Sequence, residues 1–221
     1  MKLSQRTNEI LKNFSGINNS LLFNEGSVLR TVTEGKTLIA KAKVDESFPR
    51  QFAIYDLNQF LGSVSLLDDP DFDFGESSLT AKNGSGSIRY FYADPSMITT
   101  APKKDLNLPS VEVQFKLSAK TLKSVLQAAN VLGLPEVIIQ GDGSSIRVGA
   151  TNTKNDTSNA YSYEVGETNK TFRFIYKVEN LKLILTDYLV SVSEKGITHF
   201  TNDDDTVQYW VANEVGSTYD N

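Results

Sequence analysis

The hydrophobic and polar positions are clearest in the second half of the chain. Apolar and polar residues alternate over 111–118, the pattern of a half-buried strand. Positions 119–132 change to helical spacing, which predicts a helix with one apolar face formed by Leu122, Val125, Leu126, Ala129 and Leu132. Three short apolar segments then predict strands over 136–140, 145–150 and 160–165.

The same order of elements then begins again. A strand pattern over 171–176 leads into helical spacing at 177–185, and three further strands are expected over 188–194, 196–201 and 206–212. The first half fits the same scheme with its opening strand missing or frayed. It has predicted helices over 2–14 and 56–67 and predicted strands over 20–23, 27–32, 37–44, 50–55, 71–75, 78–82 and 87–93.

Local sequence matches support this internal duplication. The triplet "KLS" at Lys2 recurs at Lys116, and Thr7 and Thr121 stand in the same register. The stretch "AIYDLNQFLGSVSLL" and the stretch "FIYKVENLKLIL" both pass from a strand pattern into helical spacing. The sequence therefore predicts an α+β protein of two similar domains, each a doubled β-α-β-β-β unit with helices on one face of antiparallel sheets.

The domain boundary is expected near residue 100. Residues 93–110, "ADPSMITTAPKKDLNLPS", hold three of the six prolines and show no periodicity, which is typical of an extended linker. We therefore expect an N-terminal domain over 1–94, a linker over 95–109 and a C-terminal domain over 110–221.

The charge is unevenly distributed. The whole chain carries −5, with a pI near 5.0, which argues against an ordinary basic nucleic-acid-binding protein. The predicted helical windows 2–15, 56–67, 116–132 and 177–186 hold eight basic residues against three acidic ones, a net of +5, so the remainder carries −10. The eight are Lys2, Arg6, Lys12, Lys116, Lys120, Lys123, Lys177 and Lys182.

Two explanations of this separation remain open. Lysine favours helices and aspartate favours turns, which by itself produces part of it. Because four repeated units would present their helices alike, a basic surface directed at phosphates explains the pattern better.

The arrangement resembles that of DNA sliding clamps. Two doubled domains, a proline-bearing crossover and lysines on the helices are typical of that family. The opening "MKLS" with "LKNF", the stretch "AIYDLNQFLGSVSLL" and "DPS" before the linker are similar to the clamp of T-even-type tailed phages, the processivity factor of the replicative DNA polymerase. The likeness is densest over residues 1–67 and mainly topological after residue 110.

The resemblance implies a homotrimeric ring whose helices line a central hole around duplex DNA, with no sequence preference. It further implies loading by a clamp loader that binds ATP itself, contacts with DNA polymerase and late-transcription factors, and action in the cytoplasm of an infected bacterial host. The eight basic residues above are then expected to face DNA, whereas the helix at 56–67 carries no basic residue.

The resemblance also implies an apolar pocket near the linker that takes partner peptides. In the last predicted strand, Val207, Tyr209 and Val211 should face the core, so Trp210 should point away from it. An outward tryptophan favours a binding site, and an equally weighted alternative is that the linker simply covers the ring. The expected lining is Met97, Ile98, Leu106, Leu108 and Trp210.

Several other classes of function lack their residues. Cysteine is absent, and the single histidine, His199, lies in a strand pattern with no nucleophile motif beside it. The acidic runs at 68–73 and 203–205 fall at predicted turns and lack the spacing of a calcium loop. We expect no catalytic residue, metal or cofactor, no membrane segment and an intracellular, soluble protein. The alternative function is a structural or adhesion β-rich virion protein, which does not predict lysines gathered on helices.

Overall fold

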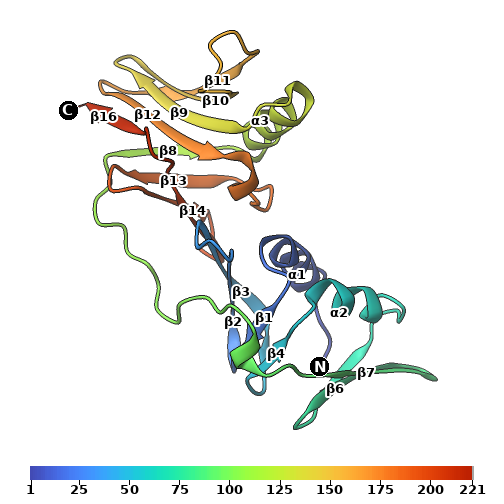
Figure 1. The fold of residues 1–221 in the computed structure, drawn as a ribbon. Helices are drawn as coiled ribbons and strands as arrows, with labels where there is room; N and C mark the ends of the chain where they lie inside the picture. The colour runs from blue at the N-terminus through green and yellow to red at the C-terminus, as the bar shows by residue number, and fades with distance from the viewer. Residues whose placement is uncertain (221) are drawn as a thin grey trace. The chain divides into compact units, whose positions relative to one another are not determined.

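The computed structural model describes residues 1–220, which form two compact units (Figure 1). Unit 1 comprises Met1–Asp105 and unit 2 begins at Leu106, so the division falls inside the segment expected to be a linker. That segment starts with a short 3-10 turn, Pro95–Met97, which Asp94 caps by accepting a hydrogen bond from the Ser96 amide.

Unit 1 consists of two successive groups of elements, each with one helix and several strands (Figure 1). Helix α1 (Gln5–Ile17) is followed by β1 (Leu21–Phe23), β2 (Gly26–Val32) and β3 (Leu38–Phe48). The second run is β4 (Phe52–Ile54), α2 (Leu57–Val64), β5 (Asp71–Phe74), β6 (Ser78–Asn83) and β7 (Gly86–Phe91). The pairs β1–β4, β2–β3, β5–β6 and β6–β7 are all antiparallel.

Helices α1 and α2 lie beside each other in unit 1, and α1 packs on β3 (Figure 1). The buried face of α1 is apolar apart from Thr7 and includes Ile10, Leu11, Phe14 and Ile17. Phenylalanines from β1, β3 and β4 fill the space between the strands, where Phe23 and Phe52 stack with ring centroids 4.4 Å apart. The packing of α1 on β3 leaves the outer face of the helix toward solvent.

Unit 2 repeats this order with its opening strand present. The first run is β8 (Val113–Leu117), α3 (Ala119–Leu132), β9 (Glu136–Asp142), β10 (Ser145–Thr151) and β11 (Tyr161–Glu167). The second is β12 (Thr171–Lys177), β13 (Tyr188–Ser193), β14 (Ile197–Asn202), β15 (Val207–Ala212) and β16 (Thr218–Asp220). One sheet has the order β11-β10-β9-β12-β16, and β15, β14, β13 and β8 pair in that order in another.

The first residues of the chain stand where the missing strand was expected. In unit 2, β8 pairs antiparallel with β13, the strand after the second junction. In unit 1, the Met1 amino group donates to the Phe72 carbonyl at 3.0 Å, and the Phe72 amide donates to the Met1 carbonyl at 2.7 Å. Since Phe72 lies in β5, the equivalent of β13, residue 1 keeps a remnant of the opening strand's pairing.

The helix predicted over 177–185 is wrong. Only a 3-10 turn, Val178–Asn180, forms there, and the next residues alternate between buried Leu181 and Leu183 and exposed Lys182. The Ile184 amide donates to the Tyr209 hydroxyl at 3.2 Å, and the Ile184 carbonyl accepts from the Tyr188 hydroxyl at 2.6 Å. These tyrosines occupy backbone groups that a helix would have used internally, so the segment stays extended.

Two smaller expectations also differ from the structure. Leu132 was expected on the inner face of α3 but is 38% exposed, because the helix ends there and Gly133 turns the chain with a φ of 64°. Strand β16, which pairs with β12 through Phe172 and Tyr219, was not expected. Within residues 1–220, no helix has the length and apolarity needed to cross a bilayer.

Candidate DNA-facing and partner-binding surfaces

Four of the eight basic residues lie on the exposed faces of α-helices. Arg6 and Lys12 project from α1, and Lys120 and Lys123 project from α3, all opposite the buried faces of their helices. Arg6 and Lys120 each stand two residues after a capping serine, so the two units present one cation at an equivalent point. Helix α2 carries no basic residue, as the sequence indicated.

The two helices begin with the same local structure. The Ser4 hydroxyl accepts from the Thr7 amide at 3.2 Å, and the Ser118 hydroxyl accepts from the Thr121 amide at 3.1 Å. Each cap satisfies one of the amides that a helix start leaves without an internal partner. The repeated "KLS" triplet therefore marks the start of a helix in each unit. The basic residues Arg6 and Lys120, which follow it, stand at the same helix position.

A carboxylate from another element completes each helix start. The carboxylate of Glu46, on β3, accepts from the Ser4 amide and the Thr7 hydroxyl, and the side chain is only 9% exposed. In unit 2, Asp187 accepts from the Ala119 amide at 2.7 Å. Sequence reasoning missed both residues, since each acts on a helix that lies about 40 or about 70 positions earlier in the chain.

The ionisation of Glu46 follows from these contacts. Burial opposes the charged form, but the hydrogen bonds from Thr7 and the Ser4 amide outweigh it and lower the pKa of Glu46 below its ordinary value. A negative charge at the start of α1 also interacts favourably with the helix dipole. Glu46 thus fixes the first turn of α1, which carries Arg6.

Lys2 and Lys116 precede the helices. Lys116 is an exposed residue of β8, and Lys2 lies before α1 and forms an ion pair with Asp69. That hydrogen bond to Asp69 is the main reason why the pKa of Lys2 is raised. The expectation that Lys2 belongs to the helix is wrong, because the chain is extended until Ser4 caps α1.

Lys177 and Lys182 lie outside the α-helices, so the expectation that they project from a helix over 177–185 is wrong. Lys177 ends β12, where its ammonium group lies 3.9 Å from the Glu214 carboxylate and 4.0 Å from that of Glu179. Lys182 is exposed in the extended segment after the 3-10 turn. Two acidic neighbours reduce the positive potential that Lys177 can offer to a phosphate.

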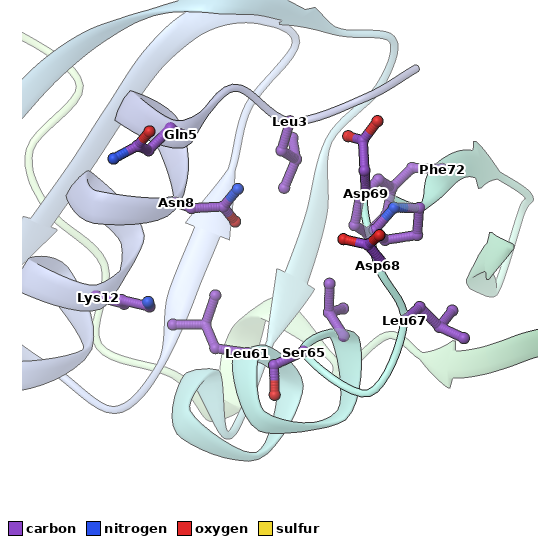
Figure 2. A pocket seen from close by; sticks show the side chains of 12 residues that line it. Leu3, Gln5, Asn8, Lys12, Leu61, Ser65, Leu67, Asp68, Asp69 and Phe72 are labelled. Carbon is purple, nitrogen blue, oxygen red and sulfur yellow. The ribbon is translucent and has the colours of Figure 1, made fainter. Parts of the chain in front are cut away.

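A pocket of about 540 Å³ opens between α1, α2 and the turn before β5 (Figure 2). Gln5, Asn8 and Lys12 line it from α1, and Leu61 and Ser65 line it from the α2 side. The turn contributes Asp68 and Asp69, as well as Leu67 and Pro70. Lys12 shares this pocket with Asp68 and with Asp69, which also pairs with Lys2, so this part of the helix surface is less positive than α3, which has no acidic residue.

The expected partner pocket has its residues in both units. Met97 is 68% exposed and Ile98 is partly exposed in unit 1, whereas Leu106 and Leu108 are partly exposed in unit 2. Trp210 is only 3% exposed, so an open tryptophan surface is wrong.

The surroundings of Trp210 explain its burial. Its ring stacks on His199 of the neighbouring strand β14 with centroids 4.5 Å apart and planes 10° from parallel. Residues 207–211 are buried on both faces of β15, so Val207, Tyr209 and Val211 lie in the core as expected, without Trp210 being exposed opposite them. Within residues 1–220, the indole N–H of Trp210 finds no hydrogen-bond partner.

Two family models match the chain in succession. Residues 2–100 match the model described as DNA polymerase processivity factor, and residues 114–215 match the model described as gp45 sliding clamp, C terminal. The matches correspond to the two units.

Relatives and solved structures agree with these matches. The sliding clamp of Vibrio phage KVP40 is 34% identical over 97% of this chain and 100% of that protein, and the sliding clamp of Enterobacteria phage T4 is 29% identical over 100% of both. A. fulgidus PCNA, solved with the C-terminal region of FEN-1 bound, aligns over 99% of this chain and 100% of that chain with a TM-score of 0.70 at 15% identity. The proliferating cellular nuclear antigen of Entamoeba histolytica aligns over 94% of both chains with a TM-score of 0.67 at 11% identity.

The structural neighbours show the clamp fold, and the phage relatives show the family. The alternative of a structural virion protein gives way to that assignment. The chain belongs to the sliding clamps of T4-like phages, the processivity factors of phage DNA polymerase.

Proposed function

We propose that this clamp closes as a homotrimeric ring around duplex DNA, with the exposed faces of α1 and α3 toward the phosphates. The observation that carries the proposal is the repeated helix start, which places Arg6 of α1 and Lys120 of α3 at equivalent points on solvent-exposed faces. Lys12 and Lys123 extend the two basic faces. Lys2, Lys116, Lys177 and Lys182 take peripheral places in this surface, because they lie outside the helices.

Loose contacts suit a protein that slides. Lysine and arginine contacts to phosphate carry no sequence information, and their number sets the affinity and its dependence on salt. A net charge of −5 on the whole chain weakens attraction of DNA to the rest of the surface. Retention would then come from ring closure, and the helix cations would only centre the duplex.

Replacing three helix cations by glutamate tests this surface. The variant Lys12→Glu, Lys120→Glu, Lys123→Glu should abolish stimulation of the phage polymerase on primed DNA, since three positive charges per protomer become negative and repel phosphate. A matched control reverses the exposed lysines Lys36, Lys82 and Lys154, which lie outside the helices, and should retain stimulation. Equal activity of the two variants would exclude the DNA-facing assignment.

Edge strands support the trimeric assembly. Strand β7 is an edge strand of the sheet β5-β6-β7 in unit 1. Strand β11 is an edge strand of the sheet β11-β10-β9-β12-β16 in unit 2. An unpaired edge can hydrogen-bond to a strand of another copy, and such head-to-tail contacts close into a ring when the rotation allows it. A solution mass of three chains is expected, and a monomer at micromolar concentration would contradict it.

We also infer the remaining partners from the family. An ATP-driven clamp loader would open the ring, the polymerase and late-transcription factors would dock on it, and the site of action would be the infected bacterial host. The docking pocket for partner peptides stays a prediction, with the expected lining Met97, Ile98, Leu106, Leu108 and Trp210. Because Trp210 is the single tryptophan, its fluorescence titrated with a polymerase tail peptide tests its place, and an unchanged spectrum at saturation would remove it.

A further inference from the structure

The hairpin between β6 and β7 contains the single Asn-Gly pair of the sequence, Asn83-Gly84. Asn83 ends β6, and Gly84 turns the chain with a φ of 55°. Asn83, Gly84 and Ser85 are all exposed to solvent. Asparagine followed by glycine is a typical turn sequence, because glycine adopts positive φ without strain. The absence of a side chain after the asparagine also lets the next backbone nitrogen approach the asparagine side chain closely.

The backbone nitrogen of Gly84 is available as a nucleophile. Within residues 1–220, the Gly84 amide donates no hydrogen bond. The space where a Cβ of residue 84 would lie is open, with no atom of another residue within 4 Å. Neither a hydrogen-bond acceptor nor a neighbouring side chain therefore holds this nitrogen away from the Asn83 side-chain carbon.

The Asn83 side chain joins the hairpin to the turn before β5. Its amide group donates a hydrogen bond to the Asp68 carbonyl. On the same turn, a Cβ added at Gly86 would lie 2.7 Å from a methyl carbon of Leu67, so the tip of the hairpin rests directly on this turn. A change in the Asn83 side chain therefore acts on the turn as well as on the hairpin.

We propose that Asn83-Gly84 is a site of spontaneous deamidation, whose product releases the β6–β7 hairpin from the turn before β5. The deprotonated Gly84 nitrogen forms a bond to the Asn83 side-chain carbonyl carbon, and the side-chain amide group leaves as ammonia. Water then opens the resulting succinimide ring and gives aspartate or isoaspartate at position 83. The overall change consumes water, releases ammonia and needs no enzyme or oxidant. The site goes beyond the proposed function and requires neither a closed ring nor DNA.

The product cannot keep the contact with the turn. A carboxylate only accepts hydrogen bonds, so it has nothing to donate to the Asp68 carbonyl. It also adds a negative charge next to a turn that already carries the exposed carboxylates of Asp68 and Asp69. In isoaspartate the backbone runs through an additional carbon, which disturbs the pairing of residue 83 with Gly86. The tip of the hairpin therefore loosens.

Peptide mapping by mass spectrometry follows the reaction in the full chain at mildly alkaline pH. Trypsin releases residues 83–89 as one peptide, in which Asn83 is the only asparagine. Deamidation at Asn83 should be about tenfold faster than at Asn155, which is also exposed and begins a turn but precedes Asp156. Gly84→Ala should slow the reaction at Asn83 about tenfold and leave Asn155 unchanged, since a methyl group hinders the attacking nitrogen.

Hydrogen exchange tests the consequence for the fold. Asn83→Asp has the side chain of the product and should raise exchange over residues 66–70 and 84–86 about fivefold, since the hydrogen bond to the Asp68 carbonyl is lost. The control Asn155→Asp makes the same chemical change at another exposed turn and should leave both segments unchanged.

Two results would overturn the proposal. One is equal deamidation of Asn83 and Asn155 in the wild-type chain, and the other is unchanged exchange over residues 66–70 in Asn83→Asp. Circular dichroism melts identify variants that do not fold. If Gly84→Ala does not fold, because alanine is strained at positive φ, the comparison of Asn83 with Asn155 in the wild-type chain decides by itself.

Discussion

At the scale of single residues, the carboxylates that hold the helix starts matter as much as the lysines they position. Glu46 reaches α1 from β3, and Asp187 reaches α3 from the residue before β13. Neither has a helical or strand spacing that could have revealed its role, because the contact is made across the fold. The capping serines, in contrast, could be read from the repeated "KLS" triplet.

Replacing Glu46 by Gln should destabilise the chain by about 1–3 kcal/mol, since a buried charge-assisted contact with the Ser4 amide and Thr7 is lost. The folded-state pKa of Glu46 is lowered, so its contribution is present above the unfolded pKa and is lost as pH falls through the folded value. Urea unfolding between pH 7 and pH 3 should therefore show less acid sensitivity for the variant than for wild type. The exposed Glu34→Gln is the control, and a wild-type acid response of Glu46→Gln would contradict this role.

At the scale of elements, one repeated pattern gives two different structures. Helical spacing follows a strand at 56–67 and again at 177–185, yet only the first forms an α-helix. Asp56 caps α2 by accepting from the Gln59 amide at 2.8 Å, whereas Lys177, at the equivalent position, makes no side-chain cap. Lysine has no acceptor to offer an amide, so the difference was visible in the sequence, although the two tyrosines that hold Ile184 were not.

Removal of this cap has a measurable cost. Asp56→Ala should destabilise the chain by about 1 kcal/mol and lower Tm by roughly 2–4 °C, while Asp56→Asn, which retains an acceptor, should stay close to wild type. Calorimetry measures both, and hydrogen exchange at the Gln59 amide reports locally. Equal losses for Ala and Asn would mean that charge, and not capping, is what Asp56 contributes.

Some of the remaining elements are specified by local sequence spacing, and others depend on contacts with distant parts of the chain. Strand alternation and the inner faces of α1 and α3 follow from local spacing, so the order of both units could be predicted. Strand β16 could not be predicted. It has only three residues, too few to show a strand alternation, and it follows a turn at Gly216, where φ is 101°. Its pairing with β12 is what makes it a strand. The burial of Trp210 was missed for the same reason: alternation tells the two faces of β15 apart but not whether the outer face is covered.

At the scale of the whole molecule, an acidic chain keeps its helix cations on exposed faces. The helix faces were predictable, since Lys120 and Lys123 lie opposite a clear apolar stripe. The local neutralisation of Lys2 by Asp69 and of Lys177 by Glu214 was not, because each acidic partner lies far away in sequence. The effective basic surface is therefore narrower than a count of lysines indicates, which suits weak contacts and retention by closure.

The central claim is that this clamp holds DNA by encircling it, and retention on circular DNA tests that most directly. The protein is loaded on a nicked circle by the proposed clamp loader of the phage, separated from free protein by gel filtration, and followed while the circle is cut at one site. Encirclement predicts that the clamp stays with the intact circle through a high-salt wash and is lost within minutes of linearisation. Loss from the intact circle in high salt, or equal retention on circular and linear DNA, would contradict it.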